Sequence, residues 1–190
     1  MRVSIKFFQI MFLLLCLGII SAFSPKAMAQ ARIDPNKAFR IASLVSGLCW
    51  DVPSSRFVAG TRLQQFPCHV NENQQWRIEG IQTQANGNID GLIIRTVGGN
   101  ASLCVTKNNT NNLELQQCPP SSTVTRELSK VWSMREVILS NNNSRSIRLI
   151  NKQNNQCADV PSGNLNPTNL NTFECNDGAN QAWVLLPMTP

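Results

Sequence analysis

The chain has 190 residues, of which 42% are hydrophobic and 15% are charged, and its formal net charge is +6. This length and apolar content support a folded core and exclude a disordered chain. The chain contains seven cysteines but a single histidine, His69, which excludes a metal site built on two histidines.

The first 29 residues have the pattern of a secretory signal peptide. Arg2 and Lys6 precede an apolar stretch from Phe7 to Ile20, and Ala27-Met28-Ala29 follows as a small-residue cleavage site. Cleavage there would remove Cys16 and leave six cysteines and a net charge of +3. We therefore expect a secreted or periplasmic protein with three disulfides and no transmembrane segment after cleavage. An uncleaved N-terminal membrane anchor is the alternative.

After this leader, the sequence predicts short strands separated by turns. Strand-forming residues occur at 92–97, 131–134, 146–150 and 182–186. The Asn, Gly, Ser and Pro clusters between them favour turns, and no stretch has a sustained helical period. We expect a tail over residues 30–37, followed by a single all-β domain over residues 38–190.

Six cysteines and three tryptophans mark three copies of one unit. The cysteines form three successive pairs, with members 14 to 19 residues apart, and a tryptophan follows each pair. The copies are Cys49, Cys68 and Trp76; Cys104, Cys118 and Trp132; and Cys157, Cys175 and Trp183. They cover about residues 38–80, 90–137 and 144–187. Each copy is too small to bury its own apolar face, so we expect a closed barrel with pseudo-threefold symmetry and a tryptophan-containing core.

The repeat also predicts how the cysteines pair. Six cysteines allow 15 connectivities, which their spacing alone does not distinguish. Equivalent cysteines should have equivalent partners, which selects Cys49–Cys68, Cys104–Cys118 and Cys157–Cys175. Each bridge would contribute roughly 3 kcal/mol on the chain-entropy model.

Each copy ends in Gln-x-Trp or a remnant of it. The three endings are Asn73-Gln74-Gln75-Trp76, Lys130-Val131-Trp132 and Asn180-Gln181-Ala182-Trp183. With the cysteine pairs, this pattern resembles the ricin B-chain-like lectins, which are β-trefoils, over about residues 38–187. The resemblance implies a secreted lectin that recognises galactose-type glycans on cell-surface glycoproteins or glycolipids.

The resemblance also implies a shallow sugar site in the first and third copies. In this family an Asp two residues after the first Cys accepts hydrogen bonds from sugar hydroxyls. An aromatic residue two before the second Cys stacks on the sugar, and an Asn before Gln-x-Trp adds a polar contact. The matching residues are Asp51, Phe66 and Asn73 in the first copy and Asp159, Phe173 and Asn180 in the third. The middle copy has Thr106 and Gln116 at the Asp and aromatic positions.

Six neighbouring residues form a second group of candidates. They are Gln64 and Asn171, two residues before the aromatic positions; His69 and Asn176, just after the second Cys; and Gln74 and Gln181, which we expect to bond loop backbone. The alternatives are structural. The two aspartates could hold tight turns, the two phenylalanines could belong to the core, and the histidine could be an ordinary surface residue.

The residue inventory argues against catalysis. No cysteine is free once three bridges form, and a glycosidase needs two carboxylates flanking one sugar, whereas Asp51 and Asp159 belong to different copies. Neither metal-ligand spacing nor a basic cluster for nucleic acid is present in the sequence. We therefore expect a binding protein that is not an enzyme and has no cofactor, metal or nucleic-acid partner.

Two other functions stay open. The first is a cell-surface-binding accessory subunit of an exported multi-chain toxin, similar to the accessory subunits of cytolethal distending toxin, with another exported chain as partner. The second is a degenerate trefoil used for protein–protein contact.

Overall fold

The computed structural model describes residues 34, 36–83, 89–120, 123, 126–138 and 145–188. The expected signal peptide over residues 1–29 lies outside these residues. Within the described part, no helix is long and apolar enough to cross a membrane.

The regular elements of the described residues are short strands and single-turn 3₁₀ helices. The strands are β1 (Phe39–Ser43), β2 (Cys49–Asp51), β3 (Gln64–Phe66), β4 (Trp76–Thr83), β5 (Ile89–Thr96), β6 (Leu103–Lys107), β7 (Leu113–Gln117), β8 (Trp132–Ile138), β9 (Arg145–Asn151), β10 (Cys157–Asp159), β11 (Thr168–Asn169), β12 (Asn171–Phe173) and β13 (Trp183–Pro187). The 3₁₀ helices are η1 (Pro53–Ser55), η2 (Glu72–Gln74), η3 (Gly99–Ala101), η5 (Leu128–Lys130), η6 (Pro161–Gly163) and η7 (Ala179–Gln181). The four predicted strands correspond to β5, β8, β9 and β13, which confirms the all-β prediction.

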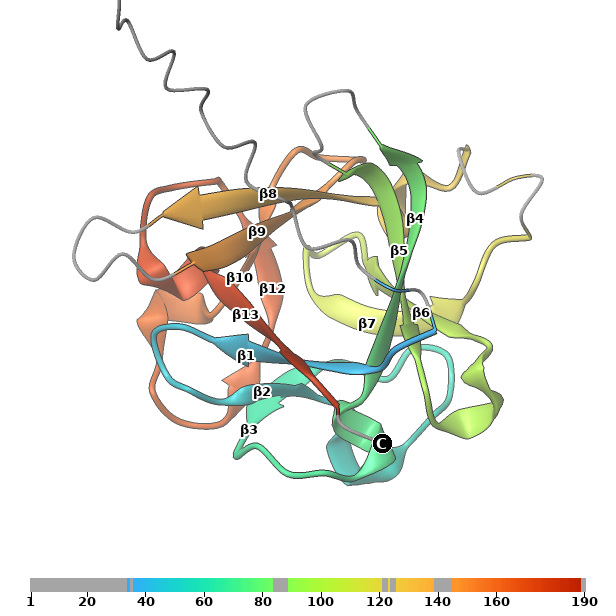
Figure 1. Cartoon of the computed structure of the whole chain (residues 1–190), viewed down its shortest axis with the longest axis horizontal. Helices are drawn as coiled ribbons and strands as arrows, with labels where there is room; N and C mark the ends of the chain where they lie inside the picture. Colours follow the sequence, from blue (N-terminus) through green and yellow to red (C-terminus); the bar gives the residue numbers. More distant parts are fainter. Residues whose placement is uncertain are drawn as a thin grey trace, which may run out of the picture. The chain divides into compact units, whose positions relative to one another are not determined.

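Six strands form a closed barrel (Figure 1). Strand β1 pairs with β13 and β4, β13 pairs with β9, β9 with β8, β8 with β5, and β5 with β4. The hairpins β2–β3, β6–β7 and β10–β12 lie outside this ring. Each repeat supplies two barrel strands and one hairpin: the first repeat is β1–β4, the second β5–β8 and the third β9–β13. This is the predicted β-trefoil with pseudo-threefold symmetry.

Three leucines join the hairpins to one another. Leu63, Leu113 and Leu170 each stand five residues before the second cysteine of their repeat. The Leu63 N–H donates to the Leu113 carbonyl (2.9 Å), the Leu113 N–H to Leu170 (3.0 Å) and the Leu170 N–H to Leu63 (3.0 Å). All three residues are fully buried. We call this closed cycle of backbone bonds the leucine ring.

The core is organised by tryptophans, as expected. Each Gln-x-Trp tryptophan is fully buried, and its indole Nε1–H donates to the carbonyl of the residue after the first cysteine of its repeat. The pairs are Trp76 to Trp50 (3.3 Å), Trp132 to Val105 (3.1 Å) and Trp183 to Ala158 (3.1 Å). The ring of Trp50 also packs edge-on against Trp76 and Trp183, with centroids 6.2 and 5.3 Å apart. The first repeat therefore fills the core centre with a large side chain where the others have small ones.

The three predicted disulfides are present, one in each repeat. They join Cys49 to Cys68, Cys104 to Cys118 and Cys157 to Cys175. Disulfides persist in oxidising surroundings, so this pairing indicates an extracellular or other oxidising compartment.

The Trp132→Phe variant should be clearly destabilised. It removes the only indole donor to the Val105 carbonyl among the described residues, and it leaves a void in a fully buried site. The lost bond alone corresponds to about 1–3 kcal/mol of unfolding free energy. Urea denaturation followed by circular dichroism measures this loss. The exposed Phe173, changed to Leu, is the matched control and should shift stability by less than about 0.5 kcal/mol.

Candidate functional site

Asp51 lies at the end of β2, directly before a tight turn. The turn contains η1, and Ser54 there has a positive φ of 52°. The Val52 N–H donates to the Asn73 carbonyl (2.9 Å), which ties the turn to η2. The Asp51 carboxylate does not bond this turn: its hydrogen-bond partners in the described part of the chain come from β3 and η2.

The Asp51 carboxylate is buried under three side-chain amides. Gln64 donates to Oδ2 (2.9 Å), and Asn73 and Gln74 donate to Oδ1 (2.7 and 3.1 Å). The residue is only 2% exposed. A carboxylate has about four acceptor positions, so one position on Oδ2 is left. The side-chain oxygens of Gln64 and Asn73 accept no hydrogen bond from the described residues. They are therefore two further acceptors beside the remaining position on Oδ2.

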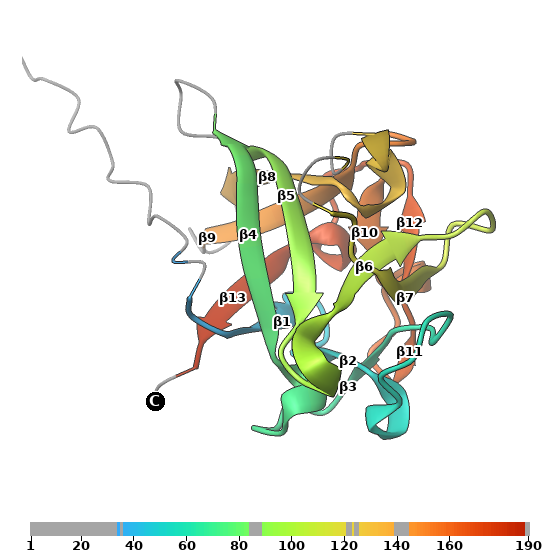
Figure 2. The ribbon, with the colours of Figure 1, turned by 90° about the vertical axis from the view of Figure 1, so that its right-hand side faces the viewer.

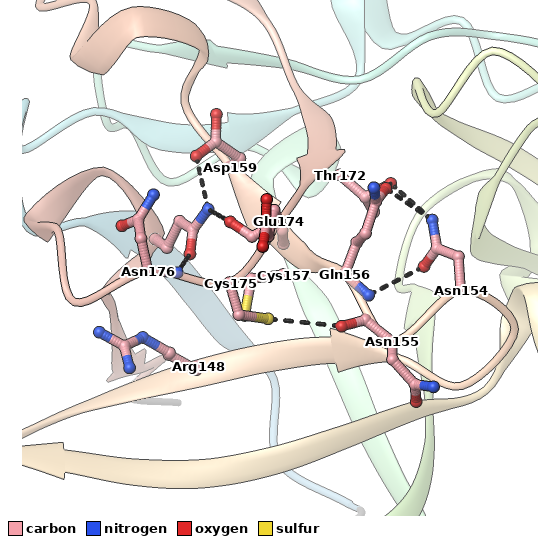
Figure 3. Close-up of a disulfide and its surroundings, with 12 residues drawn as sticks. Arg148, Asn154, Asn155, Gln156, Cys157, Asp159, Thr172, Glu174, Cys175 and Asn176 are labelled. Atoms are coloured by element: carbon pink, nitrogen blue, oxygen red, sulfur yellow. Dashed lines mark hydrogen bonds between the residues drawn. A yellow bond between two sulfur atoms is a disulfide. The ribbon is translucent and has the colours of Figure 1, made fainter.

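The third repeat builds the same arrangement around Asp159, which lies beside the Cys157–Cys175 disulfide (Figure 3). Asn180 and Gln181 donate to Oδ2 (2.5 and 3.0 Å). The Asn171 amide, oriented with its nitrogen toward Asp159, donates to Oδ1 (3.3 Å). The turn after Asp159 also matches, because Ser162 has a φ of 56°. Two equivalent carboxylates are thus held by equivalent amides.

Burial raises the pKa of the Asp159 carboxyl above its ordinary value of 3.8. The amide hydrogen bonds from Gln181 and Asn180 favour the charged form and offset part of this rise in pKa. The carboxylate therefore binds a proton more tightly in the folded protein than in the unfolded chain.

Each carboxylate has an exposed aromatic ring beside it. Phe66 is 39% exposed and Phe173 is 56% exposed, so neither ring belongs to the core. In the first repeat, Cys49 pairs with Phe66 and Asp51 with Gln64, which places the ring and the carboxylate on one face of the hairpin as diagonal neighbours. Phe173 takes the same register in the third repeat.

Gln74 and Gln181 bond loop backbone, as expected. The Gln74 side chain accepts the His69 N–H (2.9 Å) and donates to the Pro67 carbonyl (3.1 Å). Gln181 accepts the Asn176 N–H (2.8 Å) and donates to the Glu174 carbonyl (2.9 Å). These bonds fix the loop that follows the second cysteine against the carboxylate.

The two sites differ at the residue after the second cysteine. In the first repeat, the His69 Nε2 lies 3.7 Å from Asp51 Oδ1, and its ring lies 6.4 Å from that of Phe66 in an edge-on orientation. In the third repeat, the Asn176 side chain instead accepts the Gly178 N–H (2.7 Å). The first site therefore has one more ring at its border.

The second repeat has a different set of side chains at these positions. Thr106 replaces the aspartate, and its hydroxyl is buried with no hydrogen-bond partner among the described residues. The residue opposite it is Glu114, which accepts amide bonds from Asn108 and Gln116 (both 2.8 Å). The acid thus lies on the other strand of the hairpin, and Gln116 takes the position that an aromatic ring holds in the other two repeats.

The sequence did not predict the role of Gln65. This residue is fully buried and donates to the carbonyls of Asn164 and Asn166, both at 2.7 Å. Its side-chain oxygen accepts from the Ser46 hydroxyl (2.8 Å). Gln65 therefore fastens a loop of the third repeat to the first site. Its partners lie about a hundred residues away in the sequence, so no local pattern identifies the contact.

The side chains offer no metal centre in the described ranges. No group of three or more His, Cys, Asp or Glu residues is placed there to hold a metal ion. The donors and acceptors around both aspartates are amides, which suit hydroxyl groups of a polar ligand.

Comparison with known proteins agrees with this fold. Residues 30–119 match the family model described as ricin-type beta-trefoil lectin domain-like. A designed threefold-symmetric protein, ThreeFoil, is 19% identical, with a TM-score of 0.60, over 80% of this chain and 99% of that chain. The C-half of an earthworm R-type lectin, in complex with GalNAc, is 16% identical, with a TM-score of 0.56, over 80% and 99%.

A third similar structure belongs to a longer protein. A mosquitocidal holotoxin is 16% identical, with a TM-score of 0.62, over 80% of this chain and 17% of that chain. At these identities the likeness shows the fold alone. No curated protein sequence matches the chain significantly.

The Asp159→Asn variant should change how stability depends on pH. The pKa of Asp159 is raised by burial, so its stabilising contribution is present below about pH 3.8 and is lost as the pH rises through the folded-state value. The variant lacks this loss, and its amide can still accept from Asn180 and Gln181. The unfolding free energy of the variant relative to wild type should therefore increase with pH between about pH 3.8 and the pKa of Asp159 in the folded protein. Above that pKa the difference should level off. Urea denaturation at several pH values measures this difference, and a difference that is constant or falls with pH contradicts the prediction.

Proposed function

Because this chain carries a ricin-type β-trefoil lectin domain, we propose that it is a secreted lectin that recognises galactose-type glycans through sites in its first and third repeats. The glycans would be those of cell-surface glycoproteins or glycolipids. The proposed signal peptide over residues 1–29 would export the chain, and the three disulfides fit that route.

One observation carries the proposal. A buried carboxylate with a free acceptor position stands beside an exposed aromatic ring in two equivalent places, at Asp51 with Phe66 and at Asp159 with Phe173. A sugar has an apolar C–H face and a rim of hydroxyls. The ring can cover the C–H face while the carboxylate accepts a hydroxyl proton, and charge-assisted bonds of this kind are the strong ones.

The energetics favour weak single sites that act together. Stacking of one ring on a sugar contributes on the order of 1 kcal/mol, as for other aromatic contacts. The amides are already held by the carboxylate, so few side chains have to become ordered on binding. Two sites on one rigid domain can engage two sugars of one surface and gain avidity.

The same geometry favours binding without chemistry. Glycoside hydrolysis uses two carboxylates that flank one bond. The side-chain donors on Asp51 and Asp159 are amides of Asn and Gln, which neither transfer protons nor attack sugars. We therefore assign no catalytic role to either site.

The Asp51→Asn and Asp159→Asn variants should each lose one site. Isothermal titration with galactose and N-acetylgalactosamine should show two binding events per wild-type chain and one in each single variant. The double variant should bind at least about tenfold more weakly, since a hydrogen bond to a charged group is worth about 1.5–3 kcal/mol. Phe66→Ala and Phe173→Ala should each weaken their own site by roughly fivefold, the ratio that corresponds to about 1 kcal/mol of lost stacking.

The second repeat supplies the matched control. Thr106→Val changes the position equivalent to the two aspartates, and it should leave the affinity and the number of sites unchanged. Double-variant binding equal to wild type would show that the sites are elsewhere. Absence of binding by the wild-type protein to any sugar on a broad glycan array would favour the degenerate trefoil instead.

A second candidate is the binding subunit of an exported toxin. It is supported by the fold of this chain recurring as a small part of a longer toxin chain. The two candidates share the glycan-binding step and differ in whether another exported chain carries an activity. Co-purification of the exported protein from its own source distinguishes them: a stoichiometric second chain favours the subunit, and a single species favours the free lectin.

A further inference from the structure

The leucine ring places one residue of each repeat beside the binding hairpin of the next. The residues immediately before the ring leucines are Arg62, Asn112 and Asn169. Each pairs with the residue that immediately follows the ring leucine of a neighbouring repeat: Asn169 with Gln64, Arg62 with Glu114 and Asn112 with Asn171. In each hairpin, a residue from another repeat therefore pairs with the second strand and extends the sheet by one position.

In the first repeat this extends the candidate site outward. Asp51 pairs with Gln64, and Gln64 pairs with Asn169. Directly opposite residues of antiparallel strands have their side chains on the same face, and the Gln64 amide does reach Asp51 (2.9 Å). The three side chains form a polar row that rises from a buried carboxylate through a half-buried amide to an exposed one. Figure 2 shows β11, which carries Asn169, beside β3.

The other two rows end differently. In the third repeat, the outer residue Asn112 donates its amide to the Thr110 hydroxyl (2.7 Å). In the second repeat, the row runs from Thr106 through Glu114 to a charged residue, Arg62. Asn169 is the outer residue whose side-chain amide makes no hydrogen bond within the described part of the chain.

Asn169 is also held in place by backbone contacts. Strand β11 pairs with β3, and the buried Gln65 amide binds the carbonyls of Asn164 and Asn166 just before it (both 2.7 Å). A free amide on a fixed backbone can bind a ligand without first ordering its loop. An exposed side chain on a loop without such backbone contacts would first have to become ordered, which weakens binding.

The spacing decides which part of a ligand Asn169 can meet. Two strand spacings separate it from Asp51, which is ~10 Å. A single pyranose ring is only about as wide as one strand spacing, so a sugar bound at Asp51 and Phe66 does not reach Asn169. A second sugar unit attached to the first does reach it.

We propose that Asn169, supplied by the third repeat, is a specificity-determining residue of the first site and binds the second sugar of a disaccharide or longer glycan. This inference rests on the proposed lectin function. Its amide both donates and accepts, so it favours a second sugar that presents a hydroxyl at that position. The first site therefore prefers disaccharides to the corresponding monosaccharides, and the third site, whose outer amide is already bonded, prefers them less.

The test uses the full chain with the third site removed by Asp159→Asn. In that background, Asn169→Ala should weaken binding of lactose and related disaccharides by about 2- to 10-fold, the range expected for one neutral hydrogen bond. Binding of galactose and N-acetylgalactosamine alone should not change. Asn166→Ala is the matched control, because this exposed Asn lies in the same loop and its side chain makes no hydrogen bond within the described residues. Circular dichroism and thermal melting establish that all variants are folded.

The outcomes separate this proposal from the lectin proposal. Equal disaccharide affinities for Asn169→Ala and Asn166→Ala, with binding still dependent on Asp51, overturn the role of Asn169 and leave the lectin function standing. Equal weakening of monosaccharide and disaccharide binding also overturns it, because a general loosening of the site then explains the loss. Absence of binding by the wild-type chain to every mono- and disaccharide on a glycan array overturns both proposals.

Discussion

The leucine ring is the constraint on which the rest of the structure depends. Leu63, Leu113 and Leu170 each give their backbone N–H to a carbonyl of another repeat, so no hairpin can satisfy these groups alone. The ring is fully buried, where an unpaired backbone group costs about 1–3 kcal/mol. The hairpins must therefore assemble together and in one register. That register then decides which side chains of neighbouring repeats become neighbours in space.

The tryptophans fix the positions of the strand ends that carry the two candidate sites. Each indole binds the carbonyl of the residue between the first cysteine and the position held by aspartate in two repeats. This bond holds the end of the strand against the core, so Asp51 and Asp159 are 2% and 3% exposed. Burial of a carboxylate is unfavourable unless donors surround it, and the amides of the Gln-x-Trp segments supply those donors. Core packing and site chemistry thus share one segment in each repeat.

The sequence predicted the parts of this structure that depend on local spacing. The cysteine pairs, the buried tryptophans and the threefold barrel follow from markers that recur at nearly constant intervals, whereas Asp51 and Phe66 were singled out by the family resemblance. The contacts between repeats did not follow, because the residues that meet are far apart in sequence and nothing local marks them. Gln65 and Asn169 are examples, since each acts on a different repeat from its own. The central position of Trp50 in the core was also not predicted. The repeat suggests residues of similar size at equivalent positions, whereas packing requires only that the side chains together fill the volume of the core.

The second repeat shows that the backbone and the site are specified separately. Thr106 pairs with Glu114 just as Asp51 pairs with Gln64, so the register is unchanged while the acid has moved to the opposite strand. On that strand the carboxylate is half-buried and bonded by two amides of its own hairpin, Asn108 and Gln116. The leucine ring and the tryptophan bond require only backbone groups and a buried indole, and neither is affected by this exchange. The fold therefore accommodates both an Asp–Gln pair and a Thr–Glu pair at these two positions. The proposed sugar site, by contrast, depends on the acid on the first strand of the hairpin and a ring two residues beyond its partner. This is why a trefoil with three equivalent backbones can present two equivalent candidate sites and a third hairpin with different side chains.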